Sequence, residues 1–149
     1  MFPVVRLALA IQLGPDASAV GVEDTVQAPP VETMVEALSR GHLVIDQARF
    51  KPADDQLVDG VEPVLRQTAR ALSRTEGRYL VFVPFERDPR FPPDTVLSRR
   101  RALTAFRRLI AAGSNPNRLA ESRGMPTQSR FLIESVAPGQ ARIELLKIE

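Results

Sequence analysis

The chain has 149 residues, of which 44% are hydrophobic and 26% are charged, an ordinary composition for one globular domain with a buried core. Its twenty basic and eighteen acidic residues leave a formal net charge of only +2, which is too balanced for a general nucleic-acid binder. The absence of Cys and the presence of a single histidine, His42, exclude thiolate sites, His-based triads and two-His metal sites, so we expect no metal and no cofactor.

The first 41 residues are predicted to form an N-terminal strand, a linker and a short helix. Residues 4–13 alternate with a period of two, which favours a half-buried strand over a signal peptide, and we expect the numbering to begin inside a longer or processed chain. Residues 14–31 are rich in Gly, Pro, Ala and Ser and indicate a linker. Val31, Met34, Val35 and Leu38 predict a helix that ends at Gly41. No segment approaches the roughly twenty apolar residues of a membrane helix, so we expect no membrane span.

Residues 42–149 alternate strands and helices and are predicted to form the main domain. An apolar run over residues 42–50 indicates a central strand. Pro52 is expected to open a helix that continues to Leu72 and bends near Asp59, because Gly60 and Pro63 interrupt its apolar stripe. Residues 78–85 predict a second buried strand. A third strand is expected within residues 117–124, and two more over 130–136 and 141–149 form a closing hairpin joined by the turn "APGQ".

An arginine-rich helix is predicted between Asp94, a suitable N-cap, and Gly113. Its arginines include Arg100, Arg107 and Arg108, which we expect to be solvated. The apolar positions predicted to form its buried side are Val96, Leu103, Phe106, Leu109 and Ile110.

Arg101 is considered separately from the other arginines, because it lies near the N-terminal pole of this helix, where the helix dipole favours an anion. Its guanidinium could bind a carboxylate through two parallel hydrogen bonds. Glu86, Asp88 and Asp94 lie in or beside the preceding loop. They either orient an ammonium group or pair with the arginines, and composition does not separate these readings.

Four motifs between residues 43 and 146 resemble the OmpA-like, peptidoglycan-associated domain family. "LSRRRALTAF" is similar to the family's Leu-Ser-x-x-Arg-Ala helix, with Leu97, Ser98, Arg101 and Ala102 in place. "GSNPNRL" and "QARIEL" resemble the Gly-x-Asp-Pro-x-Arg-Ile connection and the closing Asn-Arg-Arg-Val-Glu-Ile. "IDQARFKPADDQLVDGV" resembles the family's opening motif through Ile45, Asp46, Ala48, Phe50, Pro52 and Leu57.

The resemblance implies an α+β fold, a βαβαββ sandwich over residues 42–149, with residues 1–41 adding an N-terminal strand and a short helix. It implies a periplasmic domain, within a larger or anchored envelope protein, that binds peptidoglycan without reacting with it. The family binds diaminopimelate of the stem peptide through the motif Arg and the Asp of a Gly-His-Thr-Asp loop. The corresponding ligand-binding candidates here are Arg101, Glu86, Asp88, Asp94 and Ser98.

The chain departs from the family pattern where Gly-His-Thr-Asp is replaced by Val83, Pro84, Phe85 and Glu86. Glu86 is one methylene longer than Asp, and Pro84 lacks a backbone donor. The alternative function is therefore a scaffold or docking module in an envelope protein assembly that no longer binds peptidoglycan. The N-terminal strand could then pair with a partner protein or with a second copy. No acidic pair has a recognised catalytic spacing, so an enzyme is not expected.

Overall fold

The computed structural model describes residues 27–92, 94–121 and 135–148. The predicted strand over residues 4–13 and most of the one over 130–136 lie outside these ranges. The helices are α2 (Val31–Ser39), α3 (Glu62–Ser73), α4 (Thr95–Ala111) and the short 3₁₀ helix η1 (Pro116–Arg118). The strands are β1 (His42–Arg49), β2 (Tyr79–Phe82), β3 (Phe85–Glu86), β4 (Leu119–Glu121), β5 (Ser135–Val136) and β6 (Arg142–Lys147).

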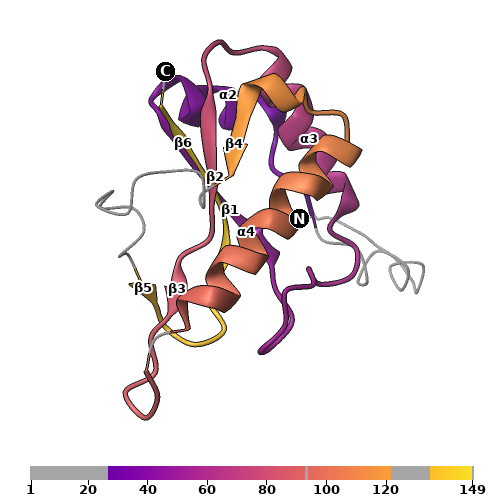
Figure 1. Cartoon of the computed structure of the whole chain (residues 1–149). Coiled ribbons are helices and arrows are strands. Elements are labelled where there is room, and N and C mark those ends of the chain that lie inside the picture. The colour runs from indigo at the N-terminus through magenta and orange to yellow at the C-terminus, as the bar shows by residue number, and fades with distance from the viewer. Residues whose placement is uncertain (1–26, 93, 122–134, 149) are drawn as a thin grey trace, which may run out of the picture.

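Four strands form one mixed sheet in the order β1-β6-β2-β4. Strand β6 is antiparallel to both β1 and β2, whereas β2 and β4 are parallel and are connected through α4. Along the chain the sheet strands and the helices between them run β1-α3-β2-α4-β4-β6 (Figure 1). The predicted α+β class and βαβαββ order are thus confirmed.

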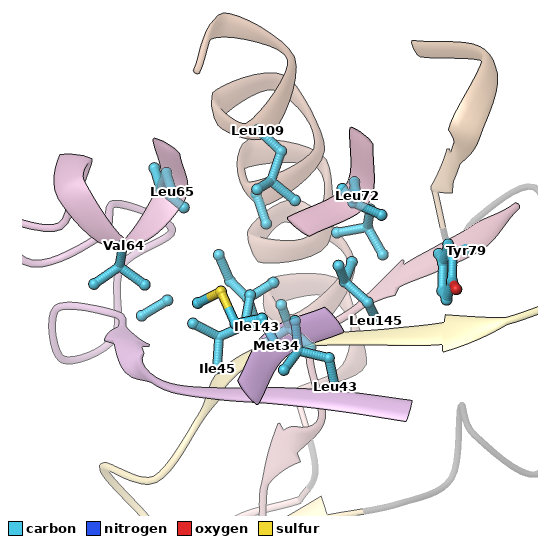
Figure 2. Packing of buried hydrophobic residues seen from close by; sticks show 14 of the residues in the cluster. Met34, Leu43, Ile45, Val64, Leu65, Leu72, Tyr79, Leu109, Ile143 and Leu145 are labelled. Atoms are coloured by element: carbon cyan, nitrogen blue, oxygen red, sulfur yellow. The ribbon is translucent and has the colours of Figure 1, made fainter. Parts of the chain in front are cut away.

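The main core lies between the helices and one face of this sheet (Figure 2). Helix α2, which precedes the predicted boundary between residues 41 and 42, shares this core through Val31, Met34 and Leu38. Burial of these side chains removes apolar surface from water, which is the main favourable term in folding. The core residues labelled in the close-up are Met34, Leu43, Ile45, Val64, Leu65, Leu72, Tyr79, Leu109, Ile143 and Leu145.

Strand β2 is buried on both of its faces. Tyr79 and Val81 belong to the main core, whereas Leu80 and Phe82 form a second cluster with Leu146. Successive side chains of a strand point to opposite faces, so the uninterrupted apolar run of β2 supplies both clusters.

Helix α3 begins ten residues later than the sequence predicted, at Glu62 instead of Pro52. The chain before it forms turns, with the Lys51 N–H donating to Gln56 O at 2.9 Å. Gly60 has a φ of +80°, which a glycine adopts readily, and Pro63 lies in the first helical turn, where its missing N–H costs nothing. The two breakers therefore mark a helix start, and the predicted bend near Asp59 is wrong.

The predicted closing hairpin is also wrong. Strand β5 pairs in parallel with β3, whereas β6 inserts between β1 and β2 in the main sheet. The "APGQ" turn is present, with the Gln140 N–H donating to Ala137 O at 3.0 Å and Gly139 at a φ of +80°. This turn joins two sheets, because both edges of β6 are occupied by other strands. The predicted strand over residues 78–85 is divided into β2 and β3 around Pro84, which has no N–H to donate.

Helix α4 has its predicted ends but a different buried side. Asp94 Oδ1 accepts from the Leu97 N–H at 2.9 Å, and Gly113 follows the helix at a φ of +117°. Leu109 is buried as predicted. The prediction that Val96 is buried is wrong, because its side chain is 60% exposed. Leu103, Phe106 and Ile110 are only half-buried. Small residues let a helix approach its neighbours closely, so the helix turns its alanines inward. The buried positions of α4 are Arg101, Ala102, Ala105 and Leu109.

Candidate functional site

A pocket of about 320 Å³ lies at the N-terminal end of α4. This end of the helix lies beside the pair of strands β3 and β5 (Figure 1). The structure brings all five ligand-binding candidates to this pocket, although they come from β3, from the loop before α4 and from α4 itself. The lining residues are Ala53, Phe85, Glu86, Asp88, Phe91, Pro92, Asp94, Leu97, Ser98, Arg101 and Pro138.

Arg101 is only 1% exposed, and its guanidinium is held by backbone carbonyls. Its Nε donates to Asp54 O at 2.7 Å and its Nη2 donates to Lys51 O at 3.1 Å. The guanidinium carbon also lies 5.2 Å from the centre of the Phe50 ring, within the range of a cation–π contact. These contacts use two of the five donors of Arg101 and tie α4 to the turn that follows β1.

Glu86 is the nearest acidic partner of Arg101. Its Oε2 lies 3.6 Å from Arg101 Nη1, an ion pair that is too long for a hydrogen bond. The same oxygen accepts from the Gly139 N–H at 2.9 Å. Glu86 therefore links the start of α4 to the turn between β5 and β6, and a quarter of its side chain remains exposed.

Asp88 is bound on both oxygens by the neighbouring Arg90. Its Oδ1 accepts from Arg90 Nε at 3.1 Å and from the Arg90 N–H at 3.0 Å, and its Oδ2 accepts from Arg90 Nη2 at 2.8 Å. These hydrogen bonds, first from the side chain and then from the backbone, lower the pKa of Asp88 from 3.8 to about 2. Asp88 is thus an ionised carboxylate in the pocket, with an arginine already bound to it.

Asp94 and Ser98 position the first turn of α4. Asp94 caps the helix through Oδ1, while the Ser98 hydroxyl donates to Val83 O at 2.5 Å. The second bond fixes the helix start against the end of β2, just before Pro84. Both side chains therefore have structural roles in addition to lining the pocket.

The pocket combines one guanidinium with three carboxylates, so it is suited to a small group that carries both charges. Arg101 can bind an anion, and Glu86, Asp88 and Asp94 place negative charge around an adjacent cation. Phe85, Leu97 and the 64% exposed Phe91 add apolar surface for an aliphatic stem. The arrangement contains the groups needed to recognise an amino acid by its two charges.

The remaining arginines of α4 are on or near the surface. Arg100 and Arg107 are exposed as predicted, and Arg100 lies 3.6 Å from Asp55. Arg108 is only half-exposed and forms a hydrogen-bonded ion pair with Glu62. Among the described residues, no group of three or more His, Cys, Asp or Glu side chains could hold a metal ion.

The partners that hold the site together were not predicted from the sequence. The carbonyls of Lys51 and Asp54 orient Arg101, and the Gly139 N–H orients Glu86. Every residue except proline carries the same backbone groups, so no sequence pattern distinguishes these. Of the groups that contact Arg101, apart from the candidate Glu86, only the Phe50 ring was already marked in the sequence, as part of the opening motif quoted above.

No protein-family model matches the chain, and a comparison with curated proteins finds no significant match. Among solved structures, the chain is similar to the periplasmic domain of Helicobacter pylori MotB, with 17% identity over 72% of each chain and a TM-score of 0.47. It is also similar to the cell wall anchor of the T6SS from Pseudomonas aeruginosa, with 18% identity over 83% of this chain and 100% of that one and a TM-score of 0.47. With such TM-scores neither likeness bears on function, and the fold class rests on this chain's own strand order. Within the described ranges no helix is long and apolar enough to cross a membrane.

Proposed function

We propose that this chain tethers a bacterial envelope protein to the cell wall by binding peptidoglycan non-covalently. The ligand is the diaminopimelate of the stem peptide, and the domain is periplasmic. The main support for the proposal is that Arg101, Glu86, Asp88 and Asp94 all line one pocket. The sequence motifs that resemble the OmpA-like family point to the same residues.

Arg101 receives the ligand carboxylate in this proposal. Its Nη1 has no hydrogen-bond acceptor within the described ranges, because Glu86 is 3.6 Å away. An incoming carboxylate would replace this distant ion pair with close, charge-assisted hydrogen bonds from Nη1 and the remaining Nη2 donor. The bonds to Lys51 and Asp54 hold the guanidinium in place beforehand, so little side-chain freedom is lost on binding.

Glu86 receives the ligand ammonium, with Asp88 and Asp94 contributing negative charge. Glu86 is partly exposed and has one backbone donor, whereas Asp88 already holds Arg90 on both oxygens. A ligand ammonium can therefore reach Glu86 without breaking an existing bidentate pair. The longer side chain of Glu86 compensates for the absence of Asp at this loop position.

Co-sedimentation with diaminopimelate-type peptidoglycan tests the proposal. We expect wild type to pellet saturably, Arg101→Ala to remain in the supernatant, and Arg100→Ala to pellet as wild type does, because Arg100 does not line the pocket. Glu86→Gln keeps an acceptor for the Gly139 N–H but removes the charge, so it should also weaken pelleting. Circular dichroism of each variant separates lost binding from lost folding. Undiminished pelleting of folded Arg101→Ala would contradict the proposal.

The second candidate function is the scaffold or docking module without peptidoglycan binding. The contacts of Arg101 favour it, because two backbone carbonyls, the Phe50 ring and Glu86 together suffice for a purely structural arginine. In that case neither wild type nor any pocket variant pellets with the cell wall. Arg101→Ala would then lower the free energy of unfolding with no other loss.

A further inference from the structure

The side of α4 that faces away from the core carries a strip of apolar and basic residues. We call it the α4 strip, and it consists of Val96, Arg99, Arg100, Leu103 and Arg107. These positions are spaced by three, four, seven and eleven from Val96, so they share one side of the helix over three turns. They lie opposite Arg101, Ala105 and Leu109, which face the protein interior.

The α4 strip includes a hollow with an exposed apolar wall. The hollow measures about 270 Å³ and is lined by Val96, Arg99, Arg100 and Leu103. Val96 is 60% exposed and is one of two large hydrophobic side chains exposed to this degree within the described ranges. A valine at the rim of a hollow between arginines can contact an apolar side chain of a partner at little cost in desolvation.

The positive charge of the α4 strip is largely unneutralised. Helix α4 contains five arginines and no acidic residue, so the pairs at i and i+4 that usually neutralise a charged helix surface are absent. Arg100 is 3.6 Å from Asp55 of a neighbouring turn. In the part of the chain that the structure describes, Arg99 and Arg107 have neither an ion-pair nor a hydrogen-bond partner.

We propose that the α4 strip docks an acidic segment of a partner protein. An apolar side chain of that segment fills the hollow between Val96 and Leu103, and carboxylates on either side of it pair with Arg99 and Arg107. Arginine suits this role because its planar fork binds carboxylates in two hydrogen bonds. A membrane surface fits less well, because interfacial helices bury a broad row of large apolar residues and this strip offers two.

Selection from a random peptide library on the full chain tests this interface. Peptides that also bind the Arg99→Glu/Arg107→Glu variant are removed by counter-selection. We expect enrichment of an apolar residue flanked by Asp or Glu. A synthetic peptide of that consensus should bind the double variant at least about tenfold more weakly than wild type, since like charges then face each other. Val96→Ser should weaken it less.

Arg66→Glu/Arg70→Glu is the matched control, because it changes the net charge equally on exposed positions of α3. It should bind the peptide as wild type does. Failure to enrich any consensus, or an equal loss in the control pair, would overturn the proposal. So would binding of phosphatidylglycerol vesicles that depends on Arg99 and Arg107 when no peptide binds. The strip and the pocket lie on different sides of α4, so wall binding is unaffected by this outcome.

Discussion

Two arginines beside the pocket have different roles because their environments differ. Arg101 is buried and bound by carbonyls, so it has lost most of its hydration and keeps a fixed geometry. Arg90 is exposed and pairs with Asp88 two residues away, within its own loop. The buried arginine can pre-organise a binding site, whereas the exposed pair mainly determines the charge state of one carboxylate.

The Asp88–Arg90 pair leads us to expect that Asp88 loses its proton at an unusually low pH. Hydrogen bonds from Arg90 lower the pKa of Asp88 from 3.8 to about 2, so Asp88 stays ionised in mildly acidic solution. A depressed carboxyl pKa contributes stability above the ordinary value, and that contribution disappears as the pH falls from 3.8 towards 2. We expect carbon NMR of the Asp88 carboxyl to show a midpoint near 2. In Arg90→Ala the midpoint should return towards 3.8, and an unchanged midpoint would contradict this cause.

Helix α4 contributes to three different parts of the molecule. Its first turn is capped by Asp94 at the pocket, one side contributes Ala105 and Leu109 to the core, and the opposite side forms the α4 strip. The period of 3.6 residues keeps these sides separate. Substitutions in the α4 strip can therefore be tested without changing the core or the pocket.

Substitution of the helix cap separates the structural role of Asp94 from its charge. Asp94→Ala removes the bond to the Leu97 N–H and should lower the free energy of unfolding by about 1 kcal/mol. Asp94→Asn should cost close to nothing, because Asn caps helices equally well. Urea unfolding with a common slope provides the measurement. If Asp94→Asn is as unstable as Asp94→Ala, the negative charge and not the cap is responsible.

At the scale of the whole molecule, the pocket exists because the fold brings distant segments together. The turn after β1, strand β3, the start of α4 and the turn before β6 each contribute to its lining. Arg101 and Glu86 connect all four of these segments through their contact with each other and with Asp54 and Gly139. The stability of the site therefore depends on the main core that holds α4 against the sheet.

Two apolar residues of α4 test that dependence. The sequence predicted both Val96 and Leu109 as buried, but Leu109 is fully buried and Val96 is 60% exposed. Leu109→Ala should lower the free energy of unfolding by roughly 2–5 kcal/mol, because it removes core contacts and leaves a cavity. Val96→Ala should change it by less than about 0.5 kcal/mol. Similar losses for the two variants, measured by thermal or urea unfolding, would contradict the assigned faces of α4.

The errors in reading the sequence have a common physical origin. The pattern of apolar positions was enough to predict β1 and the buried part of β2, and the cap residues Asp94 and Gly113 were enough to predict the ends of α4. The apolar pattern does not report how closely two elements approach, so Val96 was assigned to the core in place of Ala102 and Ala105. Likewise, Gly60 and Pro63 indicate that the apolar stripe is interrupted, but they do not indicate whether a helix bends or begins there. The folded structure shows that a helix begins at Glu62.

Local spacing and side-chain chemistry were enough to predict the βαβαββ order of the main strands and helices and the ends of α4, because both depend on neighbouring residues in the chain. The motifs also pointed to the charged residues that line the pocket. The assembly of the pocket, in contrast, depends on contacts between segments that are distant in the sequence. Strand β6 lies between β1 and β2, so β5 pairs with β3 and not with β6. The same fold places the carbonyls of Lys51 and Asp54 within hydrogen-bond distance of Arg101. Backbone N–H and C=O groups are nearly the same in every residue, so the sequence does not indicate which of them will pair. Their partners depend on where the folded chain places them.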